Sequence, residues 1–144
     1  FYFAGMTLGR FFSGLLALRF SDWKIIITGQ SIIFIAVLIL LITNDTASAV
    51  LGFFLIGLGN GPVFPNMTHL TPILYKKETS QSIIGMEMAF SNLSIMLTPV
   101  LFGFISDVMG NEIFPVFLTV MFALMAGCTI ILKVGDSRSQ WRKI

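Results

Sequence analysis

The sequence predicts an all-α transmembrane fold with five membrane-spanning helices, and two observations predict it. First, 56% of the 144 residues are hydrophobic and only 11% are charged, whereas a soluble domain has about 25% charged residues. Second, five apolar segments follow one another, and a membrane span needs about 20 residues. The segments contain Leu, Ile, Phe and Met without two-residue alternation, which favours helices over barrel strands. They cover residues 1–18, 25–43, 46–75, 79–106 and 113–132.

Composition also excludes several function classes. A net charge of +2 gives no footprint for nucleic acid. The single cysteine, Cys128, lies in an apolar run without partners at metal spacing, so we expect neither a disulfide nor a metal site. One histidine and no paired carboxylates or phosphate-binding loop argue against an enzyme or a bound cofactor. The chain begins at Phe1 inside an apolar segment, and we interpret it as the C-terminal portion of a longer protein.

The basic residues predict the orientation in the membrane. Eight of them lie in the first link, the third link or after the last segment, and the second and fourth links have none. Basic residues near span ends mark the cytoplasmic side. We therefore expect a cytoplasmic C-terminus in a plasma or inner membrane, with a bundle over 1–134 and a short basic tail over 135–144 that begins where Gly135 stops the helix. The eight residues are Arg19, Lys24, Lys76, Lys77, Lys133, Arg138, Arg142 and Lys143.

The first segment combines small residues with an arginine. Gly5, Gly9 and Gly14 lie four or five residues apart, a spacing that lets helices approach closely, and we interpret them as packing residues. Arg10 lies nine residues before Arg19, which is roughly 13 Å deeper along a helix. Such an arginine is costly unless a cavity, a carbonyl or an acidic group receives it. Two interpretations stay open: Arg10 serves a cavity or gate ion pair, or it snorkels to the cytoplasmic surface.

The second and fifth segments contain few polar residues and predict outer, lipid-facing helices. Within the second segment, we expect Gln30 to form a hydrogen bond to another helix.

The third segment is interrupted by three glycines and two prolines over residues 57–66. A helix can be broken inside a membrane only where protein or a water-filled cavity satisfies the freed backbone groups. Many transporters build their substrate site at such a break. We therefore predict Asn60 and Asn66 as substrate ligands, brought together by a kink because a regular helix would place them on different faces. His69 shares a face with Asn66, and we interpret it as an ordinary helix-end histidine rather than a proton site. The predicted break residues are Gly61, Pro62, Pro65 and, in the fourth segment, Pro99.

The fourth segment contains Glu87 at the head of a polar stripe. The spacings to the other stripe residues are four, three and four, which places all of them on one helical face. An ionised carboxylate in hydrocarbon is expensive, so this face should point away from lipid. Burial disfavours the charged form, which suits a site that takes up and releases a proton. The alternative is a protonated or ion-paired glutamate that only links helices. The other stripe residues are Ser91, Ser94 and Thr98.

The first link resembles a loop of the major facilitator superfamily. That loop reads Gly-x-Leu-x-Asp-Arg-x-Gly-x-Arg/Lys and joins the second and third helices of a six-helix half on the cytoplasmic side. This chain matches it at Gly14, Arg19 and Lys24, but has Leu18 at the aspartate position and Ser21 at the second glycine. The aspartate helps to latch the cytoplasmic gate in the family. The resemblance therefore implies a latch that is weaker or differently built.

The third and fourth segments resemble the tenth and eleventh helices of fucose-permease-like members of that family. Residues 57–65 read Gly-x-Gly-x-Gly-Pro-x-Phe-Pro, and residues 85–89 read Gly-Met-Glu-Met-Ala, with Glu87 where the family pattern suggests Gln. The resemblance makes the five segments helices eight to twelve of twelve, most of a C-terminal six-helix bundle. It implies a partner N-terminal bundle and a central cavity lined by helices ten and eleven, with nine and twelve outside. It also leaves Glu87 a possible role in contacts with that N-terminal bundle.

Three functions follow from these observations. The first is a secondary active transporter of the symporter type, which takes up a small polar solute such as a sugar together with a proton. Asn60 and Asn66 would bind the solute, Phe64 would stack on it, and Glu87 would carry the proton. The second is an exporter of amphipathic compounds, because fifteen Phe and eight Met suit an adaptable apolar cavity. The third is a membrane subunit that does not transport.

Overall fold

The structure is a computed structural model that describes residues 1–43, 45–75, 77–110 and 113–141, without the side chains of 77–78, 109 and 137–141. All five elements in these ranges are helices, and the described residues contain no strand. The predicted all-α class is therefore confirmed. The helices are α1 (Tyr2–Leu16), α2 (Asp22–Ile42), α3 (Thr46–Leu74), α4 (Lys77–Met109) and α5 (Phe114–Trp141).

Four of these helices, α2 to α5, are long and apolar enough to cross a membrane. Helix α1, the first of the five predicted segments, has 15 residues in this sequence. At 1.5 Å per residue it is about 22 Å long, whereas the hydrocarbon core measures about 30 Å.

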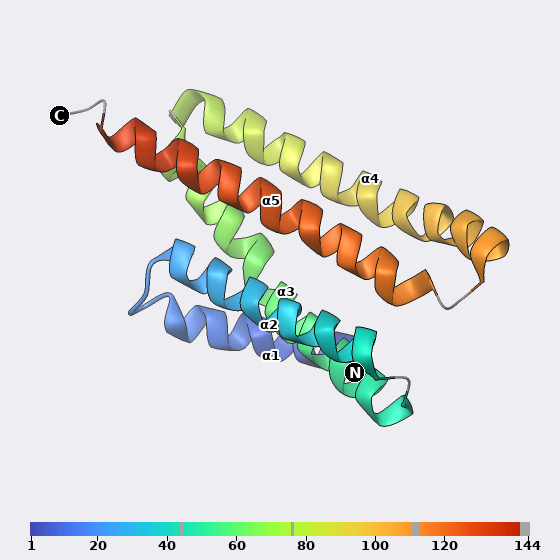
Figure 1. Ribbon diagram of the computed structural model, residues 1–144. Coiled ribbons are helices and arrows are strands. Elements are labelled where there is room, and N and C mark those ends of the chain that lie inside the picture. The colour runs from blue at the N-terminus through green and yellow to red at the C-terminus, as the bar shows by residue number, and fades with distance from the viewer. Residues whose placement is uncertain (44, 76, 111–112, 142–144) are drawn as a thin grey trace.

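Helices α1, α2 and α3 form the closely packed part of the molecule, and α4 and α5 lie along one side of it (Figure 1). The buried hydrophobic residues of the described chain concentrate on α2 and α3. Six of these eight residues belong to α2, which contacts both α3 and α5. One face of α2 is thus buried against its neighbours, whereas Ile27, Phe34 and Ile35 on it are exposed. The eight core residues are Ile25, Ile26, Ile33, Ala36, Val37, Leu40, Val63 and Leu70.

Glycines bring the backbones of α1 and α3 together. A Cβ atom added at Gly5 or Gly9 would collide with carbonyl oxygens of α3, and one added at Gly57 would collide with the carbonyl of Tyr2. At Gly61 the added atom would lie 2.6 Å from the carbonyl oxygen of Met6. The packing role predicted for Gly5 and Gly9 is confirmed. Gly14 has nothing within 4 Å of the corresponding position, so the same interpretation is wrong there.

A second pair of glycines joins α2 to the opposite side of α3. A Cβ atom at Gly29 would lie 2.6 Å from the Gly59 carbonyl oxygen, and one at Gly59 would lie 2.5 Å from the Gly29 carbonyl oxygen. The glycines of residues 57–61 therefore alternate between two neighbours. We call these two sets the α1–α3 glycine contact (Gly5, Gly9, Gly57 and Gly61) and the α2–α3 glycine contact (Gly29 and Gly59).

The predicted helix breaks are not present. Helix α3 runs through Gly61, Pro62 and Pro65 without interruption, and α4 runs through Pro99. An internal proline removes one backbone donor from the helix, and neighbouring helices and local adjustments can compensate for it within a membrane. In α3 both sides of the glycine stretch are held by α1 and α2, so the glycines serve helix contacts and not a break.

The C-terminal helix is also longer than predicted. Helix α5 continues through Gly135 to Trp141, because a glycine inside a helix costs only about 1 kcal/mol relative to alanine. The prediction that Gly135 stops the helix is therefore wrong, and residues 135–141 continue α5. Residues 142–144, with Arg142 and Lys143 of the orientation argument, lie outside the described residues, as does Lys76.

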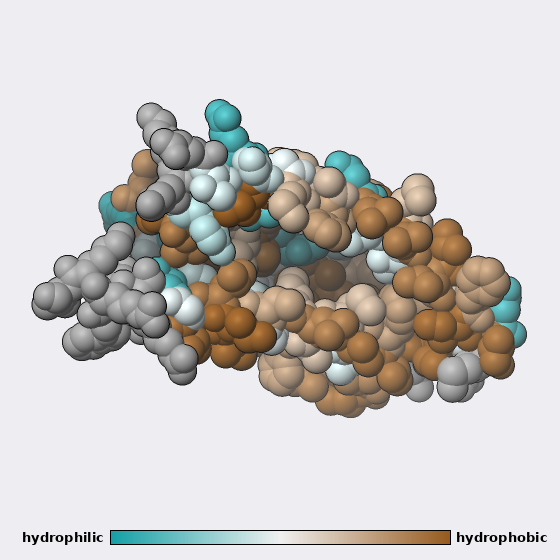
Figure 2. Space-filling view, turned by 90° about the horizontal axis from the view of Figure 1, so that it is seen from above, coloured by the Kyte–Doolittle hydropathy of each residue, from teal (hydrophilic) through white to brown (hydrophobic). Residues whose placement is uncertain are grey.

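Polar side chains connect α5 to α2. Gln30 Nε2 donates to Thr129 Oγ1 at 2.6 Å, which confirms the interhelical role predicted for Gln30. Seven residues away on each helix, near the start of α2, Trp23 Nε1 donates to Asp136 Oδ2 at 3.1 Å. Figure 2 looks onto the side where α4 and α5 lie in Figure 1, and it shows a hollow with hydrophilic residues at its floor.

Candidate solute cavity

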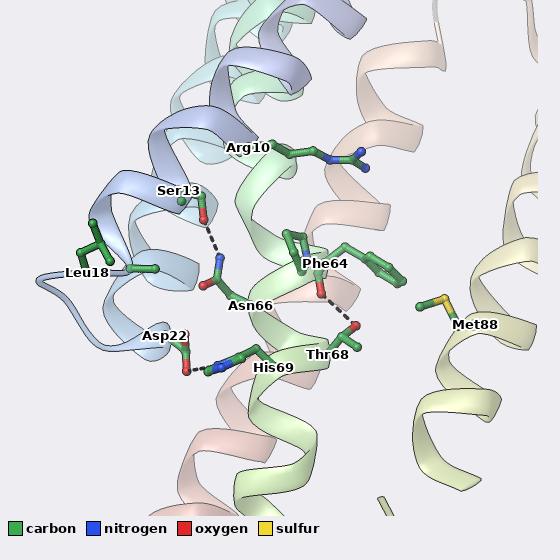
Figure 3. A pocket seen from close by; sticks show the side chains of 12 residues that line it. Arg10, Ser13, Leu18, Asp22, Phe64, Asn66, Thr68, His69 and Met88 are labelled. Carbon is green, nitrogen blue, oxygen red and sulfur yellow. Dashed lines mark hydrogen bonds and ion pairs between the residues drawn. The ribbon is translucent and has the colours of Figure 1, made fainter. Parts of the chain in front are cut away.

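A cavity of about 750 Å³ lies between α1, α3 and α4, next to the link that leads into α2. Helix α1 supplies one wall, the second half of α3 supplies the opposite wall, and α4 contributes Met88 (Figure 3). This is the end of the bundle that the basic residues predict to be cytoplasmic. The lining residues are Arg10, Ser13, Gly14, Ala17, Leu18, Asp22, Phe64, Pro65, Asn66, Thr68, His69 and Met88.

Arg10 is an exposed residue of the cavity wall. Its side chain extends away from α1 across the cavity and not along the helix towards Leu18 (Figure 3). Among the residues that the structure describes, Arg10 makes neither an ion pair nor a hydrogen bond. This placement favours the cavity interpretation of Arg10 over snorkelling.

The two asparagines of α3 do not share a site. Asn66 lines the cavity but is only 5% exposed, and its Nδ2 donates to Ser13 Oγ at 2.8 Å and to the Pro62 carbonyl oxygen at 2.5 Å. Asn60 lies outside the lining, and its Nδ2 donates to the Tyr2 hydroxyl at 3.1 Å. Because α3 stays helical, the two side chains keep different positions along α1. Both asparagines therefore connect α3 to α1.

The apolar part of the lining comes mainly from Phe64 and Met88. Phe64 is 37% exposed and Met88 is 41% exposed, and the two side chains point towards each other across the space between α3 and α4 (Figure 3). A ring in this position offers a flat apolar surface to a solute. Sequence reasoning identified Phe64, but Met88 was missed because it is one of eight methionines in a largely apolar chain.

Glu87 lies beside the cavity and not in its lining, although the next residue, Met88, contributes to the wall. Its Oε1 accepts a hydrogen bond from Thr71 Oγ1 of α3 at 2.7 Å. Its Oε2 is buried and has no partner among the described residues. A buried carboxylate oxygen without a donor is costly when the group is ionised. The two oxygens of this carboxyl group therefore have different surroundings.

The cytoplasmic gate residues predicted from the first link separate in the structure. Gly14 lines the cavity, whereas Arg19 and Lys24 are exposed and lie outside its lining. Leu18, which stands at the family's aspartate position, is 83% exposed.

The acidic residue of this region is instead Asp22, the first residue of α2. Its Oδ2 lies 3.0 Å from Nδ1 of His69 on α3. The pair was missed by sequence reasoning, although Asp22 is the only acidic residue before Asp45. The scarcity of acidic residues in this part of the sequence could have marked Asp22 as a candidate.

The described residues contain no group of three His, Cys, Asp or Glu side chains that could hold a metal ion. Of the predicted site residues, Arg10, Asn66, Phe64 and Gly14 line one cavity, whereas Asn60, Arg19 and Lys24 lie outside it.

Comparisons with curated proteins and with solved structures find no match for this chain. A comparison with protein families finds that the model of the Major Facilitator Superfamily matches residues 1–143.

Proposed function

We propose that this chain, which belongs to the major facilitator superfamily of membrane transporters, takes part in the proton-coupled uptake of a small polar solute such as a sugar. The family makes it an integral membrane protein that transports. The proposal adds the solute class, the coupling to protons and a location in the plasma or inner membrane with a cytoplasmic C-terminus. Transport would follow alternating access, in which helical bundles rock about a central site.

The observation that supports proton coupling best is the environment of Glu87. One carboxylate oxygen is satisfied by Thr71, and the other is buried without a partner in the described chain. A proton on the second oxygen removes the charge that burial penalises. Helix α4 makes few contacts with the rest of the chain. A movement of α4 relative to α3 would therefore hydrate Glu87 and allow it to release the proton.

The solute would occupy the cavity beside this carboxyl group. Phe64 offers a flat apolar surface, and Thr68 and His69 offer polar groups on the same stretch of α3. Of the two asparagines, only Asn66 lies in the lining. We therefore restrict the proposed asparagine ligand to Asn66, whose Nδ2 already serves the contact with α1.

Glu87→Gln tests the proposal. The variant keeps the size and the acceptor of the side chain but cannot exchange a proton, so uptake into proteoliposomes should lose its response to an inward proton gradient. Exchange of labelled for unlabelled solute should persist, because exchange needs no net proton movement. Asp45→Asn, which removes an exposed carboxylate before α3, is the matched control and should retain the response. A Glu87→Gln protein that still responds to the gradient would remove Glu87 from the mechanism.

Export of amphipathic compounds is the second candidate, and the exposed Leu18, Phe64 and Met88 in the cavity favour it. An apolar, adaptable lining suits varied hydrophobic solutes. Efflux of a hydrophobic dye that depends on Phe64, together with no uptake of sugars, would support export over the first proposal.

A further inference from the structure

The cavity contains one positive charge that no acidic side chain of the described chain neutralises. Its titratable lining residues are Arg10, Asp22 and His69. Asp22 Oδ2 lies 3.0 Å from His69 Nδ1, so the partner of the Asp22 carboxylate is His69 and not Arg10. Arg10 has no ion pair or hydrogen bond within the described part of the chain. A guanidinium group stays protonated in proteins, so this charge is permanent.

We propose that the solute carries a carboxylate group and that Arg10 binds it. The inference rests on the proposed transport function and narrows the solute to small hydroxylated monocarboxylates, such as sugar acids. A charged arginine within a membrane is expensive unless a counter-charge, a carbonyl or water receives it. The planar guanidinium fits a carboxylate with two parallel hydrogen bonds. Arg10 offers one permanent positive charge in a lining that also contains the Asp22 carboxylate, so the lining favours a monoanion over a phosphate dianion.

The helix that carries Arg10 is held firmly in place. The neighbouring Gly9 presses against the backbone of Leu58, and a Cβ atom added at Gly61 would lie 3.0 Å from the backbone nitrogen of Arg10. The α1–α3 glycine contact thus fixes the start of the arginine side chain relative to Phe64. A binding group is more precise when a rigid element supports it.

The rest of the lining suits the remainder of such a solute. In Figure 3, Phe64 lies between Arg10 on one side and Thr68 and His69 on the other. A carboxylate at Arg10 would therefore place a sugar ring against Phe64 and its hydroxyl groups near Thr68 and His69. The backbone carbonyl of Phe64 accepts the Thr68 hydroxyl at 3.2 Å, which leaves the Thr68 oxygen able to accept a hydrogen bond.

Binding and uptake by the intact gene product test this inference together. Purified protein in nanodiscs is titrated with lactate, gluconate and glucuronate, with the neutral amide of each acid, and with glucose 6-phosphate. At least one carboxylate should bind about tenfold or more tightly than its amide, the range expected for charge-assisted hydrogen bonds. Glucose 6-phosphate should bind more weakly than that carboxylate. The amide comparison uses only the unmodified protein, so it does not depend on the folding of a variant.

Variants then assign the preference to Arg10. Arg10→Gln should abolish the preference for the carboxylate, and Arg10→Lys should retain part of it. Lys133→Gln, which removes an exposed cation of α5 far along the chain, is the matched charge control and should leave binding unchanged. Equal binding of acid and amide, tighter binding of the phosphate ester, or an undiminished preference in Arg10→Gln would each overturn the inference.

Uptake separates this inference from the proposed function. Proteoliposome uptake of a neutral sugar without binding of any carboxylate would leave the transporter proposal standing and overturn the role of Arg10. Carboxylate binding that depends on Arg10 without any uptake would leave the ligand class standing and overturn the transport proposal. Absence of both binding and uptake would overturn both.

Discussion

Asn66 shows how a polar residue in a membrane helix can serve structure at the edge of a site. Its amide nitrogen donates to Ser13 of α1 and to the carbonyl of Pro62 in its own helix, and the side chain is buried. The amide therefore spans the boundary between two helices while one edge of the residue touches the cavity. A solute would meet the asparagine already held in place by these bonds.

Replacement of Asn66 by leucine should consequently lower stability. The change removes both hydrogen bonds and leaves the Ser13 hydroxyl without its donor, and the expected loss is about 1–2 kcal/mol. Thermal unfolding in detergent measures it. Asn92→Leu is the matched control, because Asn92 is exposed and bonds only to the Met88 carbonyl of its own helix. Equal destabilisation by the two variants would show that the contact with Ser13 contributes nothing.

Sequence reasoning reached Asn66, Phe64 and Arg10 because polar or aromatic residues are conspicuous in apolar segments. It wrongly placed Asn60 and Asn66 in one site, since their positions depend on whether α3 bends and on where α1 lies. The contacts of Glu87 with Thr71 and of Asp22 with His69 join residues 16 and 47 positions apart. Such pairs depend on how helices are arranged in space, which periodicity along one helix does not specify.

At the scale of elements, glycines decide how α1, α2 and α3 meet. The α1–α3 glycine contact involves successive positions in the same order on both helices, so α1 and α3 run in the same direction. The α2–α3 glycine contact uses the other side of α3. Close approach of this kind replaces the hydrophobic driving force that is absent between helices in lipid.

Gly57→Ala should therefore separate α1 from α3. The new methyl group would collide with the backbone carbonyl oxygen of Tyr2. A backbone atom cannot move away as the end of a flexible side chain can. Overpacking of this kind typically costs about 1–3 kcal/mol. Gly127→Ala in α5 is the control: nothing lies within 4 Å of its added atom, and the higher helix propensity of alanine should make it neutral or slightly stabilising. Unfolding in a denaturing detergent compares the two, and similar midpoints would contradict the glycine contact.

The helix boundaries were largely predictable, as shown by α3, which begins at Thr46 as expected and ends at Leu74, one residue before the predicted end. The continuous helix through Gly61, Pro62 and Pro65 in the interior of α3 was not predictable. Glycine and proline have the same local preferences whether they break a helix or lie at a close contact, and only the neighbouring helices distinguish the two cases. The same reason explains why Gly135 did not end α5 and why one face of the apolar α2 is buried.

At the scale of the whole molecule, the chain divides into a closely packed part, helices α1 to α3, and a part with few contacts to it, helices α4 and α5. Helices α1 to α3 contain the described hydrophobic core, whereas none of the most apolar window of α4 and only 6% of that of α5 is buried. Three polar pairs link the two parts: Thr71 and Glu87, Gln30 and Thr129, and Trp23 and Asp136. Two ring contacts, Phe34 with Phe122 and Phe53 with Phe114, add apolar links to α5. This arrangement suits a transporter in which α4 moves relative to α3.

A double-mutant cycle should detect the link between Gln30 and Thr129. Gln30→Leu and Thr129→Val each remove one partner of the 2.6 Å hydrogen bond, and their coupling free energy should be about 0.6–1.7 kcal/mol, the range for such bonds in membranes. Thermal unfolding of the two single variants and the double variant gives this value. Strictly additive effects would mean that this hydrogen bond does not help to hold α5 to α2.

The alternation of glycine contacts along residues 57–61 has a consequence for how this chain can change in evolution. Each residue turns a helix by about 100°, so one inserted residue in this stretch would rotate everything beyond it. Gly61 would no longer meet Met6, and Asn66 would no longer meet Ser13. Substitutions and length changes are therefore expected in the links of related chains, while the number of residues between Gly57 and Asn66 stays constant.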